Sequence, residues 1–325
     1  MDWFKRVFRN KNSILVIVTL VVMLMFGFLN RNYLRLENIK NIMNSMSYTG
    51  TVCVGMVLLL IAGEVDLAAG AEACFGGVFA ALTIGAGIPW PFGVVAAVIF
   101  GMIAGCINAF FVNKLNLMGF IATIGIMNVY NGLIRVATSS QNLPISNQSF
   151  YKLGTLAIFD TIPLPFLIML VLMIVYGCIL TFTTFGRSIY LVGGNRRAAR
   201  LCGIDHKKTT TILYINNGAL AGLAGAVLAS RMHSASPASG DTVALDAITA
   251  VVLGGVSFVG GVGNMTGCFI GILLLTAFKA GLTATGLQSY WQIIAQGALL
   301  IVALSVDFFS ENARLRALER QRLKA

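Results

Sequence analysis

The chain has 325 residues, 57% of them apolar and only 11% charged, with a formal net charge of +11 and a mean hydropathy of +0.84. A soluble domain carries about 25% charged and about 45–50% apolar residues. This composition excludes an ordinary soluble domain and predicts an all-α integral membrane protein. The basic residues lie in loops and tails between apolar runs, so the charge indicates membrane topology and contact with lipid rather than a nucleic-acid partner.

Apolar runs that could cross a bilayer, which takes about 20 residues of helix, recur along the chain. We expect about ten transmembrane helices in one domain, residues 1–310, followed by a charged tail, residues 311–325. The expected spans are about 13–29, 42–62, 67–87, 91–112, 117–137, 162–183, 211–231, 247–262, 264–284 and 289–306. The run 247–262 is short and ends in paired glycines, which indicates a broken or re-entrant helix.

The distribution of basic residues predicts the orientation in the membrane. With the N-terminus inside, the expected cytoplasmic segments hold 16 of the 23 Lys and Arg residues. The positive-inside rule therefore favours cytoplasmic N- and C-termini and a cytoplasmic loop 186–210. Arg31, Arg35 and Lys40 fall on the outer side and are the counter-signal.

Loop 186–210 has the pattern of a small folded unit. Gly193 and Gly194 can end the preceding segment, and Asn195 is a good N-cap for a short helix from Arg196 to Leu201. Gly203 can supply the left-handed residue that stops this helix. A capped helix between two spans is a candidate docking element, whereas a basic loop that only fixes topology is the alternative. The candidate docking residues are Gly194, Asn195, Arg196, Arg197, Ala198, Ala199 and Arg200.

Acidic residues near apolar runs are costly in a membrane and often mark function. Asp66 and Asp246 are expected N-caps of helices that start near 67 and 247, and Glu64 and Glu72 flank the first of them. The alternative is that these broken helices form a gate or line a pathway. Because Glu72 follows Asp66 by about one and a half turns, we expect it to face away from Asp66.

Several amide side chains lie within the expected spans. Asn108, Asn128, Asn131 and Gln292 are candidates for a polar pathway that admits a hydroxylated solute, and the alternative is hydrogen bonding between neighbouring helices. Glycines spaced four apart, at 101 and 105 and at 218 and 222, predict close helix crossings.

The two halves of the chain resemble each other faintly. Gly101-x-x-x-Gly105-Cys106 has a counterpart in Gly263-x-x-x-Gly267-Cys268, and the segments around Asp66 and Asp246 each precede a run with paired glycines. An odd number of spans separates the two copies, so the second would be inverted. Inverted repeats with broken helices are a common transporter plan.

Catalytic and metal-binding signatures are missing from the sequence. It has no G-x-x-x-x-G-K-[ST] phosphate loop, no credible nucleophile–base pair, two histidines and six scattered cysteines. We therefore expect no catalytic site, no metal site and no cofactor bound by this chain. If ATP powers transport, another chain must hydrolyse it.

A family resemblance joins these features. The segment from Phe185 to Ile204 resembles the permease subunit of bacterial ATP-binding cassette (ABC) importers of the ribose/xylose sugar type. The resemblance extends over about residues 40–307 and continues through the segments Ser236-x-x-x-Gly240, Leu245-Asp246-Ala247-Ile248, Ala250–Gly255 and Gly260-Gly261-x-Gly263.

The resemblance implies a bacterial inner-membrane permease with three kinds of protein partner. These are an ATPase that holds ATP-Mg and docks on the loop helix, a second permease copy or homologue, and an extracytoplasmic solute-binding protein. The first-half motif, residues 63–70, departs from the family's Gly-Gly-Ile-Asp-Leu-Ser-x-Gly pattern because Glu64 replaces a glycine and Ala68 a serine. Alternative solutes are a nucleoside or a branched-chain amino acid, and an ion-coupled secondary transporter is the alternative class.

Overall fold

The computed structural model describes residues 11–322 and is mostly helical within them. Residues 1–10 and 323–325, which belong to the expected cytoplasmic ends, lie outside the described residues. The helices are α2 (Lys11–Leu29), α3 (Leu36–Ile61), α4 (Ala69–Gly85), α5 (Trp90–Ala109), the π-helix η1 (Phe110–Lys114), α6 (Gly119–Thr138), α7 (Gln148–Thr155), α8 (Leu164–Phe182), α9 (Thr184–Gly194), α10 (Arg196–Leu201), α11 (His206–Met232), α12 (Val243–Leu253), α13 (Met265–Ala284) and α14 (Ser289–Arg322).

Short strands join some of the loops at one end of the molecule. β1 (Leu143–Pro144) pairs antiparallel with β4 (Ser234–Ala235), and β2 (Ala157–Ile158) pairs antiparallel with β3 (Ile162–Pro163). The β1–β4 pair ties the loop after α6 to the loop after α11. A helical architecture follows from the setting, because lipid offers no hydrogen bonds to the backbone and a helix satisfies its own.

Seven helices in the described part of the chain are long and apolar enough to cross a membrane. Three shorter apolar helices accompany them, at Ala69–Gly85, Val243–Leu253 and Tyr290–Ser305. The expectation of an all-α membrane fold is confirmed at this level. The count of ten spans and the inverted repeats stay predictions.

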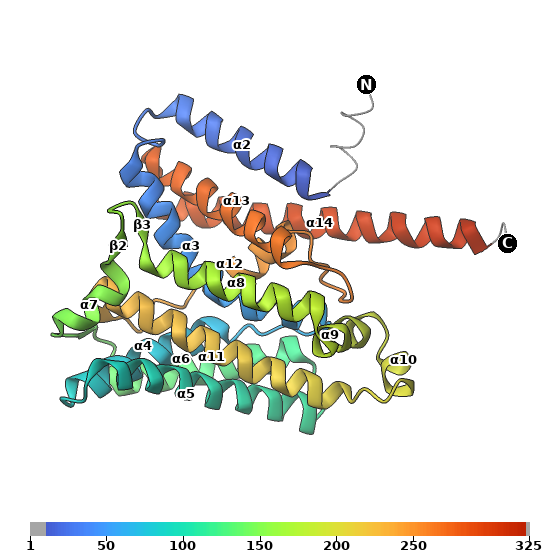
Figure 1. The fold of residues 1–325 in the computed structure, drawn as a ribbon, viewed down its shortest axis with the longest axis horizontal. Helices are drawn as coiled ribbons and strands as arrows, with labels where there is room; N and C mark the ends of the chain where they lie inside the picture. Colours follow the sequence, from blue (N-terminus) through green and yellow to red (C-terminus); the bar gives the residue numbers. More distant parts are fainter. Residues whose placement is uncertain (1–10, 323–325) are drawn as a thin grey trace.

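Helix α11 lies at the centre and packs against α3, α4 and α5 (Figure 1). Glycines set the closest of these contacts. A Cβ added at Gly218 would collide with the carbonyl oxygen of Gly101 and lie 3.0 Å from the Gly105 nitrogen. Because there is no room for a side chain, α5 and α11 cross backbone to backbone, which confirms the close crossing predicted from the glycine spacing.

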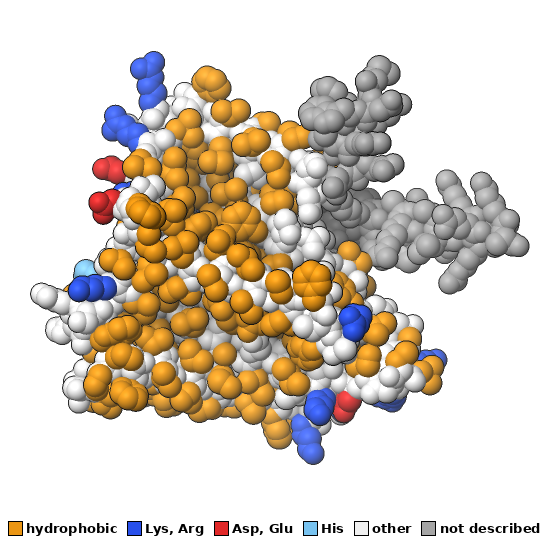
Figure 2. Space-filling view, viewed as in Figure 1, with side chains coloured by type: hydrophobic (Ala, Val, Ile, Leu, Met, Phe, Trp, Pro, Cys, Tyr) orange, Lys and Arg blue, Asp and Glu red, His pale blue; other side chains and the backbone are white. Residues whose placement is uncertain are grey.

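The surface shows how the molecule sits in a bilayer. Apolar side chains cover the middle of the visible face, and Lys, Arg, Asp and Glu gather at its two ends (Figure 2). Helices α9 and α10 lie at one end, where α2 begins and α14 ends, and α7 lies at the other (Figure 1). We call these the α10 end and the α7 end.

Candidate functional site

The short helix predicted in loop 186–210 forms as expected. Helix α10 spans Arg196–Leu201, and the side chain of Asn195 accepts hydrogen bonds from the backbone N–H of Arg197 and Ala198, both at 3.0 Å. Gly203 has a φ of +78° and follows the helix as the left-handed stop. Helix α9, which the sequence did not lead us to expect, precedes α10 directly and begins at the N-cap Thr183.

Helix α10 is held by one face and presents the other to solvent. Ala199 is fully buried, whereas Leu201 is 85% exposed. Arg197 and Arg200 are also exposed. An exposed leucine beside two arginines is a surface that another protein could cover, since apolar anchors and arginines are frequent contacts in interfaces.

An ion pair links α10 to the break between α3 and α4. The Arg196 guanidinium lies 2.7 Å from the Oε1 atom of Glu64, a buried carboxylate three residues beyond the end of α3. The Tyr214 hydroxyl of α11 lies 3.4 Å from Oε2 of Glu64 and donates to the Val65 carbonyl at 3.1 Å. Glu64 therefore connects three elements: α10, the α3–α4 segment and α11.

Helix α9 also contacts the loop before α13. The Tyr190 hydroxyl donates to the Gly263 carbonyl at 2.7 Å, and the Gly261 N–H donates to the Ile61 carbonyl at 2.8 Å. Gly193 packs against the backbone at both Ile61 and Gly261, where a Cβ would not fit. The α9–α10 unit thus touches the end of α3 in the first half of the chain and the α12–α13 loop in the second.

Asp66, Glu72 and Asn108 meet in a fully buried polar cluster. The Nδ2 atom of Asn108 lies 3.1 Å from Oδ1 of Asp66 and 2.9 Å from Oε1 of Glu72. Asn217 donates to the other Asp66 oxygen at 3.0 Å. Tyr130 donates to the Ala104 carbonyl at 2.9 Å and lies 3.3 Å from Oδ1 of Asn108. The cluster joins α4, α5, α6 and α11.

The structure corrects three expectations. Glu72 does not face away from Asp66. Helix α4 begins only at Ala69, so Asp66 lies before the helix and helical spacing does not relate the two residues. The carboxylate of Asp66 accepts from the Ala68 N–H at 2.9 Å, but the N-cap of α4 is Ala68 itself. For Asp246 the cap position is wrong: α12 begins at Val243, and Asp246 lies inside its first turn.

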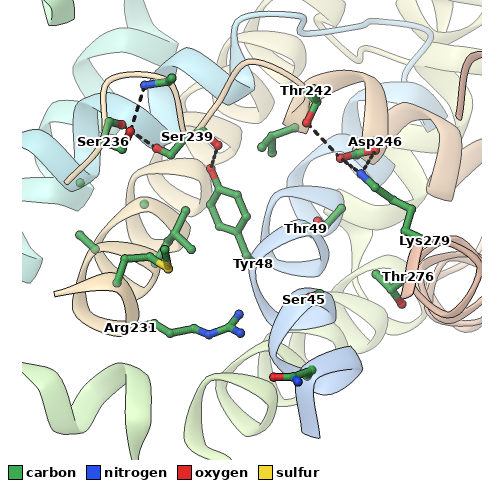
Figure 3. A pocket seen from close by; sticks show the side chains of 18 of the residues that line it. Ser45, Tyr48, Thr49, Arg231, Ser236, Ser239, Thr242, Asp246, Thr276 and Lys279 are labelled. Atoms are coloured by element: carbon green, nitrogen blue, oxygen red, sulfur yellow. Dashed lines mark hydrogen bonds and ion pairs between the residues drawn. The ribbon is translucent and has the colours of Figure 1, made fainter. Parts of the chain in front are cut away.

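A cavity of about 830 Å³ opens near the α7 end (Figure 3). Its lining comes from the first half of α3, parts of α4, α11 and α13, the segment before α12 and its first turn, the loop after α6, and the start of α14. Asp246 forms an ion pair with Lys279 of α13 here, at 2.8 Å, instead of capping a helix. Figure 3 shows this pair beside Thr242, with Tyr48 and Arg231 on the opposite side of the cavity.

The four amide candidates separate in the structure. Gln292 lines the cavity, whereas Asn108 lies in the buried cluster. Asn128 is exposed on α6 and Asn131 is partly buried there. Their roles in a pathway stay predictions. Arg231 in the last turn of α11 and Lys279 within α13 were not among the predicted site residues, although a basic residue in an apolar helix is a signal that could have marked them.

Apolar helices that bury a carboxylate cluster, with an exposed capped helix at one end and a cavity at the other, fit a multi-pass membrane transport protein. Comparison with known proteins agrees. A family model described as branched-chain amino acid transport system / permease component matches residues 38–304. The chain belongs to this permease family, whose members are inner-membrane transport subunits.

Curated relatives cover nearly the whole chain. The ribose import permease protein RbsC of Bacillus subtilis (strain 168) is 33% identical over 88% of this chain and 89% of its own length. The xylose transport system permease protein XylH of Haemophilus influenzae is 29% identical over 90% of this chain and 95% of its own. The L-arabinose transport system permease protein AraH of Escherichia coli (strain K12) is 30% identical over 87% and 86%.

A solved structure shares the fold. It is an inward-facing conformation of a metal-chelate type ABC transporter, with a TM-score of 0.50, 14% sequence identity, and coverage of 93% of this chain and 99% of that chain. At this identity the likeness concerns the arrangement of helices and not the solute.

Proposed function

We propose that this chain is the permease subunit of an ATP-driven importer that moves a monosaccharide or sugar-like solute into the cell. The names of the curated relatives support the solute class, since they are permeases for ribose, xylose and arabinose. ATP-Mg is bound by a separate ATPase subunit, and an extracytoplasmic binding protein delivers the solute. A second permease, identical or homologous, completes the pathway between two such chains.

Helix α10 is the coupling helix in this proposal, and the observation that carries it is the Arg196–Glu64 ion pair. Docking of the ATPase on the exposed side, at Arg197, Arg200 and Leu201, moves α10. The ion pair passes this motion to the break between α3 and α4, because moving Arg196 away would leave the buried Glu64 carboxylate without its charged partner.

The membrane arrangement follows from the same proposal. The α10 end faces the cytoplasm with both termini, and the α7 end faces outward. The domain 1–310 then forms about ten spans in two inverted repeats, with loop 186–210 as its coupling loop and 311–325 as a cytoplasmic tail. The two breaks that α9–α10 contacts, after α3 and before α13, lie in the two halves and support this reading.

Charge reversal at the ion pair tests the coupling role. In the complex with the ATPase, Glu64→Arg and Arg196→Glu should each reduce solute uptake at least tenfold, about 1.4 kcal/mol of lost coupling, because a buried charge is then opposed by a like charge. The double variant restores opposite charges and should recover part of the uptake. Uptake and ATP hydrolysis are measured together in vesicles that contain the binding protein.

Two further variants separate docking from coupling. Arg197→Ala with Arg200→Ala should weaken co-purification of the ATPase, because charge-assisted contacts are lost, whereas Arg196→Glu should not. Lys208→Ala removes an exposed basic residue of the same loop, in the first turn of α11, and is the matched control. Normal uptake in both single charge reversals would refute the proposed link.

A further inference from the structure

The cavity at the α7 end has the size and lining of a small-molecule site. Its volume of about 830 Å³ falls in the range of about 300–1,000 Å³ that is typical of ligand pockets. The lining is rich in groups that can bind hydroxyls. These are the side chains of Asn38, Asn41, Ser45, Tyr48, Thr49, Asn142, Ser234, Ser236, Ser239, Thr242, Thr276, Thr283 and Gln292.

Tyr48 lies in the middle of this lining. Its hydroxyl donates to the backbone carbonyl of Ser239 at 3.1 Å, which fixes the ring between α3 and the segment before α12 (Figure 3). The hydroxyl of Ser239 donates to the Ser236 carbonyl at 2.9 Å. A fixed aromatic side chain among hydroxyls and amides suits a polyhydroxylated molecule, which presents both apolar C–H groups and hydroxyls.

The cavity carries one more positive charge than negative. Lys279 lies 2.8 Å and 3.0 Å from the two oxygens of Asp246, so these two charges offset each other. Arg231 is the third charged residue of the lining. Within residues 11–322, no hydrogen bond or ion pair of its guanidinium is formed, and Figure 3 shows the group reaching toward the cavity below Tyr48.

The position of Arg231 on its helix has an ordinary explanation, but the direction of its side chain does not. A basic residue in the last turn of α11 favours the helix dipole. That effect would be equally served by a side chain directed into solvent. A guanidinium offers several N–H donors in one plane, and a carboxylate or a phosphate is the group that satisfies two of them at once.

We propose that this cavity is a transient binding site for the solute, and that the solute is a hydroxylated acid whose negative group is bound by Arg231. The inference rests on the proposed function, since it assumes that the chain moves a sugar-like solute. It narrows the solute class from a monosaccharide or sugar-like molecule to a sugar acid. Tyr48 and the hydroxyls around it contact the rest of the molecule.

Cysteine modification measures both the charge of the cavity and its occupancy. Ser45 lines the cavity on α3 and is exposed, so Ser45→Cys is introduced into a chain without other cysteines. The purified permease–ATPase complex is treated with an anionic or a cationic methanethiosulfonate reagent, with rates normalised to a free thiol. We expect the anionic reagent to react several-fold faster, and Arg231→Gln to bring the two rates together.

Occupancy is tested with matched probes. D-glucuronate and D-galacturonate differ from D-glucose and D-galactose by a carboxylate, and we expect only the acids to slow the modification of the Ser45→Cys thiol, by several-fold at saturation. Arg231→Gln should abolish this protection. Arg231→Lys should keep the preference for the anionic reagent but protect less, because lysine cannot bind a carboxylate through two parallel N–H bonds.

Controls keep the outcomes distinct. Lys152→Gln removes an equal charge from the exposed side of α7, near the same end but outside the lining, and should change neither the rate ratio nor the protection. Equal rates for the two reagents in the unchanged Arg231 background, or protection by the neutral sugars alone, overturns the inference. Co-purification of the unmodified chain with its ATPase tests the proposed function separately, so failure of one does not imply failure of the other.

Discussion

At the scale of single residues, Glu72 is a fully buried acid with few hydrogen-bond partners. One of its oxygens accepts from Asn108 at 2.9 Å, and the other has no hydrogen-bond partner among the described residues. Asp66 differs, because its two oxygens accept from Asn108, Asn217 and the Ala68 N–H. The two acids therefore contribute to the cluster unequally.

Substitutions at these two positions should separate their roles. Glu72→Gln keeps an oxygen for Asn108 and replaces an ionisable group in a fully buried site with a neutral one, so the melting temperature in detergent should stay within about 2 °C of the parent or rise. Asp66→Ala leaves the buried amide of Asn217 without its acceptor, whereas Asn108 keeps Glu72 as an acceptor, so the change should cost about 1–3 kcal/mol. Equal destabilisation by both substitutions would contradict this difference.

The sequence could not predict which residues, distant along the chain, come together in the fold. Glu64 was noticed because it departs from the family pattern, and Arg196 because it lies in a capped helix. Their contact joins positions 132 residues apart, and only the fold brings them together. The same holds for Asp246 and Lys279, and for Tyr48 and Arg231 in the cavity. Local patterns specify a helix start, whereas long-range pairing depends on how all helices pack.

At the scale of elements, the sequence predicted helix ends best where the capping signals are strong. The N-cap Asn195 and the stop at Gly203 specified α10 correctly, because both act within one helical turn. Helix α9 was missed, since its glycines and polar residues resemble a loop. Helix α12 begins earlier than expected because Asp246 is held by Lys279, and an ion pair across the fold outweighs the usual preference of Asp for a cap.

The crossing of α5 and α11 permits a test at this scale. Gly218→Ala places a Cβ against the Gly101 carbonyl, so the helices must separate, and we expect a loss of about 1–3 kcal/mol in stability. Gly132→Ala is the matched control, because Gly132 on α6 has nothing within 4 Å of its added Cβ. That change should be neutral or slightly stabilising, since alanine favours helix over glycine. Thermal melting of both variants in the same detergent gives the comparison.

At the scale of the whole molecule, the two ends differ in a way that fits an importer. The α10 end presents the exposed helix that we propose as the ATPase contact, and the α7 end has the cavity that we propose as a solute site, about a membrane's width away along the helices. The band of apolar side chains between them matches the hydrocarbon layer (Figure 2). Composition and run length were sufficient to predict this layered plan, whereas they gave no information about the cavity.

Orientation is the property of the whole molecule that the other proposals depend on, and two single-cysteine variants test it. Cys202 follows α10 and is exposed, so it should react with a membrane-impermeant maleimide in inverted vesicles but not in intact cells. Gln141→Cys, in the exposed loop after α6, should react in intact cells. Both sites lie on loops at opposite ends, so each is the control for the other. Labelling of Cys202 from outside the cell would show that the orientation is the reverse of the one proposed. The cavity would then face the cytoplasm, and the basis for α10 as the ATPase contact would be lost.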